Sequence, residues 1–414
     1  MIRIILHVRF GTSLTISPKQ APTIMHDSYD LIIAGAGASG LSLLWYLMEE
    51  GVTDHQSVLL LDQSFEPSPD KTWCFWNDEH LPLQQLIHKT WPVLEVAVYG
   101  NRFTERLQAY QYHCTRSDEY TRTILNRADS IPTIVRKKCS ITGYDLSDEL
   151  GVVHTDQGTY RAPWVFQSVM KPKDYYKQKV DISLLQHFMG VEIETKEPLF
   201  DPEKAVLMDF DTSQKHGVTF FYVLPFSETR ALVEYTFFTA TVLDDDTYRA
   251  GIDAYLQNRY KLQPSQYNIL REEKGAIPME DRYYPAKTNE RVFNIGTVGG
   301  LTKPSTGYTF TRIHRYSKKV ASALKRGENP PPVGRPGYRF RVYDLMLLRI
   351  LRDNPTMGVQ IFHDLFKHNK FDRVLQFLEE KTHPGQEIAL FSTLPYTPFF
   401  RSIYRMKHRI VTGA

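Results

Sequence analysis

Hydrophobic positions near the start of the chain follow two successive patterns. Leu31 to Ala34 form a short apolar run, and apolar residues then recur at helical spacing as far as Gly51. A second apolar run, SVLLLD, ends in Asp62. Short apolar runs are typical of buried strands, and apolar positions repeated every three to four residues are typical of an amphipathic helix. The pattern therefore predicts a strand, a helix and a second strand, in that order.

Farther along, the chain changes from alternating to helical patterns. Strands are predicted for the segments VLEVAVYG, GVVHTD, VTFFYVLPFS, RALVEYTFFT and YNILREEKGAIPM. These strands suggest a mostly antiparallel sheet in a second domain. From residue 338 helical spacing dominates, in YRFRVYDLMLLRILRD, NPTMGVQIFHDLFKH and KFDRVLQFLEE. The Pro-rich segment 328–337 before them reads as a linker.

These elements predict an α/β protein with a discontinuous first domain. We expect residues 29–175 together with 275–327 to form a Rossmann-type nucleotide-binding domain. Residues 176–274 are expected to form the substrate domain, with a mostly antiparallel sheet, and residues 338–414 a helical region.

The first 28 residues do not fit this scheme. They contain Arg3 and Arg9 but no acidic residue before Asp27, and their apolar run is short and interrupted. A targeting segment is one interpretation. We expect instead that the chain starts at a second methionine, Met25, or that residues 1–28 form a disordered tail.

Composition narrows the function classes. Hydrophobic residues make up 42% and charged residues 23% of the chain, which is ordinary for a globular protein. A net charge of +3 without a block of Lys and Arg argues against a nucleic-acid partner. The three cysteines form no CxxC pair, so we predict no zinc site, no other metal site and a reducing, cytoplasmic location. No apolar run is long enough to predict a membrane span. Aromatic residues, at 13%, suffice to line an apolar cavity or simply to fill a core.

The turn after the first strand carries a full GxGxxG motif, Gly35-Ala36-Gly37-Ala38-Ser39-Gly40. Its first glycine permits the tight turn, the second lets a pyrophosphate approach the backbone, and the third lets the helix pack close to the strand. Asp62 stands 22 residues past Gly40, where a ribose-binding carboxylate is expected. The set predicts a dinucleotide site; its position favours FAD, but its spacing does not separate FAD from NAD. A Gly-rich turn in an unrelated α/β domain is the alternative.

A second glycine cluster lies at 292–327. A strand from Val292 to Ile295, a loop and a helix from Thr309 to Gly327 are predicted. The loop contains Gly296, Gly299, Gly300, Pro304, Ser305, Thr306 and Gly307. Its hydroxyl and backbone NH groups suit phosphate or flavin edges, although a plain surface loop is the alternative.

Two further features each allow two interpretations. Glu234 stands within the apolar strand ALVEYTFFTA, where it either faces water or serves as an acid in a dry site. The C-terminal segment 393–414 mixes aromatic residues with Arg401 and Arg405. That mixture suits either a membrane surface or a helix packed on its own domain.

At this point several motifs together resemble those of a known family, the bacterial lycopene β-cyclases. The resemblance covers residues 29 to about 400. The matching segments are DLIIAGAGASGLSLLWYL, DKTWCFWNDE, LLQHFMGVEIET, LMDFD, FYVLPFSETRALVEYTFFT, KGAIPM, IGTVGGLTKPSTGYTF and FRVYDLMLLRILRD.

The resemblance implies an aromatic-hydroxylase-like fold with bound FAD. It implies an isomerase (intramolecular lyase) that converts the acyclic ψ-ends of lycopene, or a related C40 carotenoid, to β-rings without net redox change. The flavin must be reduced, with NADPH or NADH as the source. The protein is then expected in the cytoplasm, held peripherally at the inner face of the cell membrane.

The resemblance also assigns residues. Glu234 matches the essential acid, and the GxGxxG motif with Asp62 matches the FAD site. Residues Gly299 to Tyr308 match the loop at the flavin. Trp73 and Trp76 match an aromatic box near the cofactor or cavity, and we add Tyr235 and Phe238 as candidate lining of the substrate pocket. Gln167 and Val169 depart from the family, whose members often carry an acid and a basic residue there.

The implied reaction starts when an acid protonates the terminal double bond, and either Glu234 or reduced flavin is the candidate donor. Burial would raise the pKa of Glu234 and keep its proton available.

A redox flavoenzyme, either a hydroxylase or a prenyl or carotenoid reductase, is the alternative. Gly296-Thr297 counts against it, because such hydroxylases usually have Gly-Asp there. A non-catalytic lipid-binding protein is the third hypothesis. His187 reads as a core residue satisfied by backbone groups.

Overall fold

The computed structural model describes residues 28–77, 84–171 and 180–412, with side chains described as far as residue 406. The expected tail or alternative start within residues 1–28 lies, apart from Ser28, outside the described residues. No helix in the described part of the chain combines the length and apolar character that a bilayer crossing requires.

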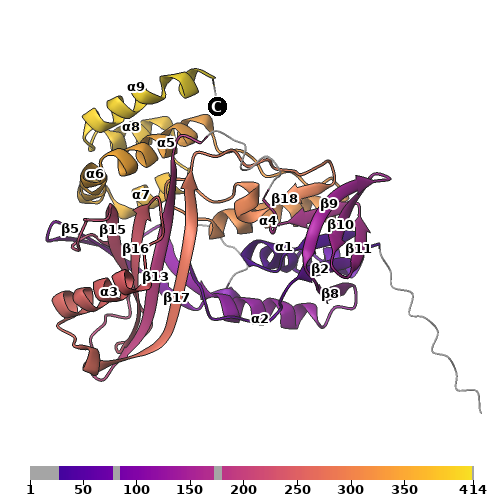
Figure 1. Cartoon of the computed structure of the whole chain (residues 1–414), viewed down its shortest axis with the longest axis horizontal. Helices are drawn as coiled ribbons and strands as arrows, with labels where there is room; N and C mark the ends of the chain where they lie inside the picture. Colours follow the sequence, from indigo (N-terminus) through magenta and orange to yellow (C-terminus); the bar gives the residue numbers. More distant parts are fainter. Residues whose placement is uncertain (1–27, 78–83, 172–179, 413–414) are drawn as a thin grey trace, which may run out of the picture.

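The nucleotide-type domain is built on a parallel sheet (Figure 1). In spatial order its strands in the described ranges are β18 (Val292–Asn294), β12 (Trp164–Gln167), β1 (Leu31–Ala34), β2 (Val58–Asp62) and β8 (Ile134–Lys138). All four residues of β1 are buried, because both faces of the sheet are covered. Leu31 and Ile33 pack with the helices α1 (Ala38–Glu49), α2 (Ser117–Ala128) and α4 (Phe310–Lys325). Ile32 packs on the other face, against a three-stranded antiparallel sheet.

That small sheet consists of β9 (Ile141–Ser147), β10 (Leu150–Thr155) and β11 (Gly158–Ala162). The strand pattern grouped the segment GVVHTD with the sheet of the second domain, although it lies within residues 29–175; in the structure it forms β10, which packs on the parallel sheet of the first domain. Alternating hydrophobicity predicted the strand correctly, but it carries no information about the sheet that the strand joins.

A seven-stranded sheet forms the second domain, and its long strands dominate Figure 1. Its order is β17 (Tyr267–Glu280), β13 (Ser183–Thr195), β16 (Arg230–Thr239), β15 (Val218–Pro225), β14 (Lys204–Asp209), β5 (Val93–Val98) and β6 (Asn101–Arg106). All neighbours pair antiparallel except β14 and β5. The expected boundaries of 176 and 274 are therefore wrong in two respects. β5 and β6 join this sheet from within residues 29–175, and β17 continues to Glu280.

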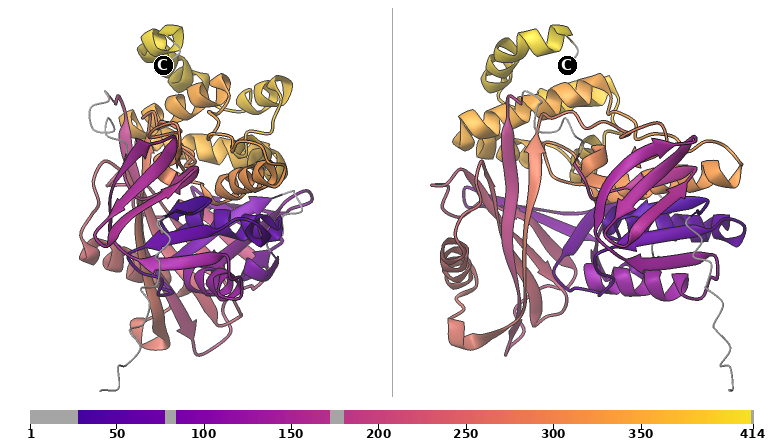
Figure 2. Two further views of the ribbon diagram at one scale, coloured as in Figure 1. Left: turned by 90° about the vertical axis from the view of Figure 1, so that its right-hand side faces the viewer. Right: turned by 45° about the vertical axis from the view of Figure 1, so that its right-hand side comes forward.

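The two faces of the large sheet have different covers. Helix α3 (Asp245–Tyr260) packs on one face (Figures 1 and 2). The other face shares a core with a small antiparallel sheet of β3 (Thr72–Asn77), β7 (Gln111–Arg116) and β4 (Lys89–Trp91). Short 3-10 turns occur at Val52–Asp54, Gln84–Leu86, Pro264–Gln266 and Gly296–Gly299.

The C-terminal helices complete this second core and lie over one end of the molecule (Figure 2). They are α5 (Tyr338–Asp353), α6 (Pro355–His368), α7 (Phe371–Leu378), α8 (Pro384–Phe391) and α9 (Tyr396–Thr412). The predicted class is confirmed: an α/β protein with a parallel sheet, a mostly antiparallel second sheet and a C-terminal helical region.

Close packing of α3 on the large sheet generates a stability prediction. A Cβ atom at Gly251 would lie 2.2 Å from Cε1 of Tyr235, which is stacked on Phe221. We expect Gly251→Ala to lower the free energy of unfolding by about 1–3 kcal/mol, the usual cost of overpacking. Gly385→Ala, in α8, is the control, because its Cβ would meet atoms only at 3.4 Å. Urea denaturation measures both; equal stability of the two variants would contradict the packing argument.

Candidate active site

Glu234 lies in the middle of β16 and is 9% exposed. Its side chain shares a sheet face with Leu232 and Phe238, which belong to the core under the C-terminal helices and away from α3. The Thr236 hydroxyl donates a hydrogen bond to Glu234 Oε1 at 2.8 Å. The water-facing interpretation of Glu234 is therefore excluded.

A glycine on the neighbouring strand brings a second carboxyl group to Glu234. In the register, Gly190 of β13 pairs with Glu234 on one side and with Glu273 of β17 on the other. A Cβ atom at Gly190 would lie 3.1 Å from Glu273 Cγ and 3.4 Å from Glu234 Cβ. Because Gly190 has no side chain, the two acids meet above it, and a protonated Glu234 donates a hydrogen bond to Glu273.

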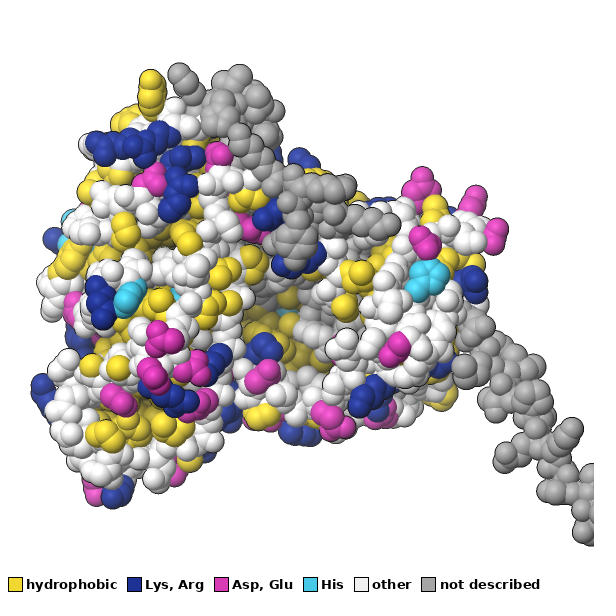
Figure 3. All heavy atoms as spheres, viewed as in Figure 1, with side chains coloured by type: hydrophobic (Ala, Val, Ile, Leu, Met, Phe, Trp, Pro, Cys, Tyr) yellow, Lys and Arg dark blue, Asp and Glu magenta, His cyan; other side chains and the backbone are white. Residues whose placement is uncertain are grey.

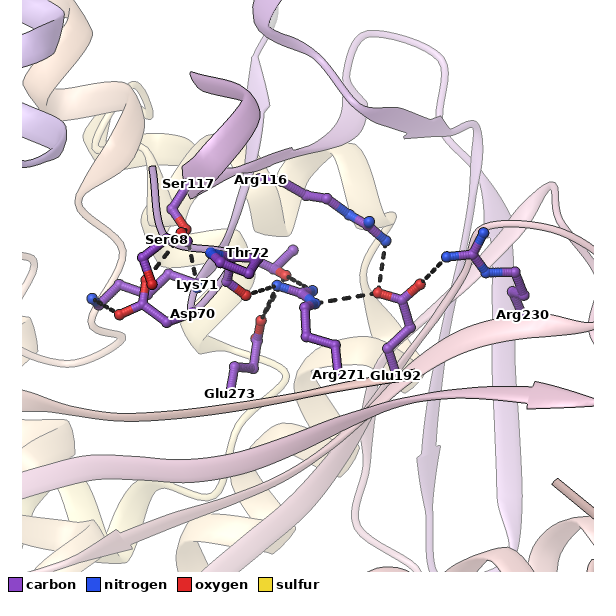
Figure 4. Close-up of polar contacts among 11 residues, drawn as sticks. Ser68, Asp70, Lys71, Thr72, Arg116, Ser117, Glu192, Arg230, Arg271 and Glu273 are labelled. Atoms are coloured by element: carbon purple, nitrogen blue, oxygen red, sulfur yellow. Dashed lines mark hydrogen bonds and ion pairs between the residues drawn. The ribbon is translucent and has the colours of Figure 1, made fainter. Parts of the chain in front are cut away.

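The two acids have different surroundings. Glu273 is 2% exposed, and its Oε2 accepts a hydrogen bond from Thr72 at 2.8 Å and pairs with Arg271 Nη1 at 3.1 Å (Figure 4). Burial raises the pKa of Glu273, and Arg271 opposes that rise. Burial and the neighbouring Glu273 together raise the pKa of Glu234 well above its ordinary value. These surroundings favour the proton on Glu234 and the negative charge on Glu273, beside Arg271.

A second buried carboxylate anchors Arg271. Figure 4 shows Arg271 between Glu273 and Glu192 of β13. Glu192, 1% exposed, pairs with Arg116 at 2.7 Å, Arg230 at 2.5 Å and Arg271 at 3.3 Å. Burial by itself would raise the pKa of Glu192, but these guanidinium groups hold it below its ordinary value. The network joins β7, β13, β16 and β17 and fixes the cation beside Glu273.

Aromatic side chains form the wall next to Glu234. Tyr222 of β15 pairs directly with Glu234 in the register. Its hydroxyl faces that of Tyr308, which also faces the Tyr112 hydroxyl. The ring of Trp76 lies 4.3 Å from that of Tyr308 in an edge-to-face arrangement. Burial raises the pKa of Tyr222 and Tyr308, so both phenols are neutral at neutral pH.

An apolar cavity of about 60 Å³ is bordered by Tyr222 and Phe238, which lie on the Glu234 face of the large sheet. Ser305 and Thr306 of the second glycine-rich segment also line it, as do the charged residues Lys303 and Asp344. Much of the remaining lining is apolar and comes from the C-terminal helical region: Phe377, Leu378, Leu390, Phe391, Leu394 and Phe399. Tyr222 and Phe238 thus separate the acid pair from a mostly apolar space that borders α8 and α9.

Two expected lining residues lie elsewhere. Tyr235 points away from Glu234 and stacks on Phe221 beneath α3. Trp73 packs against Tyr120 and Phe310 in the core of the first domain. Both assignments to the pocket are wrong, because neighbouring residues on a strand face opposite sides. Trp76 and Phe238 do lie on the Glu234 side.

The GxGxxG turn has the shape of a phosphate cradle. A Cβ atom at Gly37 would have no atom within 4 Å, whereas one at Gly40 would lie 1.8 Å from the Gly35 carbonyl oxygen. Helix α1 begins after Gly37 with neither a side-chain cap nor an acid in its first turn, so its N-terminal NH groups are available to an anion. Asp62 closes β2, and its Oδ2 accepts a hydrogen bond from the Ala36 NH at 2.6 Å. These residues fit a dinucleotide pyrophosphate.

The second glycine cluster connects this cradle to the acid pair. A Cβ atom at Gly296 would lie 2.3 Å from Ser39 Oγ, beside the start of α1. One at Gly307, whose φ is +72°, would lie 2.6 Å from Gln186 Oε1 on the Glu234 face of β13. Gln186 is four residues from Gly190, or about 13 Å along the strand.

Between these two contacts, Gly299, Gly300 and Pro304 border a cavity of about 460 Å³. Buried Lys303 pairs with Asp344 of α5 at 2.7 Å and with Glu380 at 2.9 Å. Ser305 also donates to Asp344, at 2.6 Å. The expected loop residues are therefore brought together and are tied to the helical region.

Two other residues singled out from the sequence have structural contacts. Gln167 is buried, and its amide donates to Asn294 at 2.6 Å and to the Met170 carbonyl at 2.9 Å, which closes the turn after β12. Its departure from the family pattern thus has a local structural role. His187 is buried between the hydroxyl groups of Tyr248 and Thr239 rather than backbone groups. Burial lowers the pKa of His187 to about 4.

Sequence reasoning missed Glu273, Gly190 and Arg271. One signal was present: REEKG has adjacent acids, Glu272 and Glu273, and strand alternation requires that they face opposite sides. Which acid meets Glu234 depends on strand pairing. No cluster of three or more possible metal ligands occurs in the described ranges.

Two comparisons place the chain among known sequences. The family model described as lycopene cyclase protein matches residues 30–404. A lycopene beta-cyclase from Paracoccus sp. is 27% identical over 339 residues, which cover 79% of this chain and 80% of that protein. A lycopene beta-cyclase from Pantoea ananas is 26% identical over 302 residues, with coverages of 69% and 72%.

Solved structures agree with the fold. A geranylgeranyl bacteriochlorophyll reductase-like protein from Thermoplasma acidophilum has a TM-score of 0.58 at 11% identity, covering 92% of this chain and 99% of its own. A halogenase in complex with FAD has a TM-score of 0.58 at 12% identity, with coverages of 88% and 90%. At these identities the likeness concerns the fold alone. The family model spans nearly the whole chain, and the protein described here is accordingly a member of the lycopene cyclase family.

Proposed function

We propose that the protein is a lycopene β-cyclase that converts the ψ-ends of lycopene to β-rings, yielding γ- and β-carotene. The observation that carries the proposal is the buried Glu234, which lies next to Glu273 on the sheet face that also borders an apolar cavity. Family membership and the two bacterial relatives support the same substrate class. The reaction is an isomerisation, because the substrate gains one proton and loses one proton, and its composition is unchanged.

The first step requires an acid in a dry place. Glu234 donates its proton to the terminal double bond, which leaves a tertiary carbocation. An internal double bond attacks this cation and closes a six-membered ring, and loss of a ring proton gives the β-end. A carboxyl group with a raised pKa keeps its proton at neutral pH, and low local polarity strengthens its attraction to the cation after ionisation.

The walls of the site protect the cation. Faces of Trp76, Tyr222 and Tyr308 supply π-electron density that stabilises positive charge within about 6 Å of a ring. Trp76 and Tyr222 are buried and Tyr308 is partly buried, and together they exclude water, which would otherwise add to the cation and produce an alcohol. Since these rings are held by core packing rather than by solvent-exposed loops, they are oriented before substrate arrives.

FAD is the proposed cofactor, held by residues 35–40, Asp62 and the loop from Gly296 to Tyr308. The fit of the Gly37 cradle to a pyrophosphate supports this assignment, as does the similar fold of an enzyme solved with FAD. When bound and reduced, the flavin supplies negative charge toward the cavity. We infer NADPH or NADH as the source of reducing equivalents.

A hydrocarbon substrate also suggests where the protein works. On α9, Tyr396, Phe400, Ile403 and Tyr404 recur at the spacing of one helix face and are 61%, 68%, 38% and 71% exposed. Figure 3 shows hydrophobic and basic side chains together at the end of the molecule where Figure 1 places α9. We infer that this face, with Arg401 on its flank, contacts the inner surface of the cell membrane from the cytoplasm, and that lycopene enters near Phe399.

The central prediction concerns Glu234. In a lycopene-accumulating bacterial host, the wild-type chain should convert lycopene to β-carotene, identified by chromatography. Glu234→Gln should lower cyclisation at least about 100-fold, the usual contribution of a general acid, while flavin content is unchanged. Glu194→Gln, on the less buried end of β13, is the matched control. Full activity of the Glu234 variant would refute the assigned acid.

The cofactor prediction uses the empty space at Gly37. Gly37→Val should leave the melting temperature of the apoprotein within a few degrees, because no atom lies within 4 Å of the added Cβ. The new side chain fills the pyrophosphate cradle, so flavin absorbance of the purified protein should fall at least about tenfold. Gly143→Val, on the remote strand β9, should retain its flavin. Retention of flavin by the Gly37 variant would place the cofactor elsewhere.

The membrane prediction uses the exposed face of α9. Phe400→Glu should weaken binding to anionic phospholipid vesicles about tenfold or more in flotation assays, because burial of a Phe side chain contributes about 1.5–3 kcal/mol. Val242→Glu replaces another exposed residue, 54% accessible, far from α9 and should bind like wild type. Activity in detergent micelles should survive in both variants. Unchanged vesicle binding of Phe400→Glu would exclude this face, and concentration-dependent dimerisation lost in the variant would assign it to a second copy.

A further inference from the structure

Two carboxyl groups from different strands share one buried space, and only one of them has a cation beside it. Glu273 has Arg271 and Thr72 on its Oε2, while its Oε1 has no donor in the described ranges except a protonated Glu234. Among the described residues, the Thr236 hydroxyl is the one hydrogen-bond partner of Glu234 besides Glu273. A single proton between two such acids must lie on the one without the cation.

We propose that Glu273 is the positioning residue for the acid of the proposed reaction: it accepts the Glu234 proton in a hydrogen bond and keeps the pair singly protonated. The inference rests on the proposed function, since it concerns the donor of that reaction. Gly190 is required for the same hydrogen bond, because the side chain of any larger residue there would separate the two carboxyl groups.

The other groups around Glu234 do not replace Glu273 in this role. Tyr222 on β15, Tyr308 on the 303–308 loop and Cys74 on β3 face Glu234, and burial raises the pKa of each so that they are neutral at neutral pH. Arg271 and Arg116 are the cations in this region, and both act on Glu273. Burial is the main cause of the raised pKa of Glu234, and Glu273 is the charged neighbour that raises it further.

The pair also accounts for proton balance over the cycle. The O–H bond of Glu234 breaks as a C–H bond forms on the substrate, and the pair then carries two negative charges next to one carbocation. A C–C bond closes the ring, a ring C–H bond breaks, and an O–H bond forms again on the pair. Mutual repulsion of the two carboxylates favours recovery of that proton, and nothing is oxidised or reduced.

The test compares pH profiles of purified, flavin-loaded enzyme cyclising lycopene in detergent micelles with a reductant. Glu234 is active when protonated, so activity is present below its pKa and is lost as pH rises through it. Glu273→Gln removes the neighbouring negative charge and lowers the pKa of Glu234. We expect the alkaline loss of activity to move at least about one pH unit lower, with activity restored at acidic pH. Glu272→Gln, on the other face of β17 and paired with Arg249, should keep the wild-type profile.

A second measurement does not depend on turnover, and it tests the inference even if Glu273→Gln has lost its activity. Infrared spectra of the flavin-loaded wild type should contain a protonated carboxyl band at neutral pH, and Glu234→Gln should remove it. In Glu273→Gln the band should remain at acidic pH but disappear at a lower pH than in the wild type. Gly190→Ala should reproduce the shifted profile, and Gly143→Ala on β9 should not. A wild-type profile and an unmoved infrared band in Glu273→Gln would overturn the inference. Absence of cyclisation by the wild type would instead refute the proposed function.

Discussion

The architecture depends on a cluster of acids buried among aromatic and aliphatic side chains. Moving an ionised carboxylate out of water is costly unless a cation or hydrogen-bond donors compensate for the lost hydration. The protein meets this constraint in two ways. Three guanidinium groups surround Glu192 and lower its pKa, which favours the ionised form, whereas burial and Glu273 raise the pKa of Glu234, which favours the neutral form. The ion network around Arg271 (Figure 4) therefore does more than stabilise the sheet, because its cation beside Glu273 favours the negative charge on that acid of the pair.

The same constraint explains why two domains and a helical region converge on one sheet face. A buried carboxyl group requires surrounding elements that exclude solvent. Here β3 and β7 pack on this face from one side, and the C-terminal helices pack on it from the other. The segment from Gly296 to Tyr308 begins beside the phosphate cradle and ends with Tyr308 against Tyr222, next to Glu234. Its buried Lys303 holds it to Asp344 of α5. This one loop thus contacts the glycine-rich turn, the wall beside Glu234 and the apolar cavity.

Local signals predicted much of this correctly. The first strand, the glycine cradle, the helix from Tyr338 to Asp353 and the parallel, antiparallel and helical regions all follow from periodicity and turn residues close together in the chain. The errors concern partners rather than elements. β5 and β10 were expected as strands, yet their sheets depend on long-range pairing that no local pattern encodes. Trp73 was assigned near the pocket because it matches the family's aromatic box, and Tyr235 because it follows Glu234 in an aromatic strand. Both side chains nevertheless pack in other cores.

By itself, the sequence determined that a dinucleotide-type turn exists, that Glu234 stands in an apolar strand and that its motifs are those of the lycopene cyclase family. These are properties of residues adjacent in the chain. Only the tertiary structure decided that Glu234 is buried and that Gly190 leaves space for two acids 39 residues apart to meet. It also placed Arg271 beside Glu273, where the cation favours the ionised form of that acid. The reason is physical: a pKa depends on burial and on charges a few ångströms away, and both are set by strand register and by the packing of distant segments.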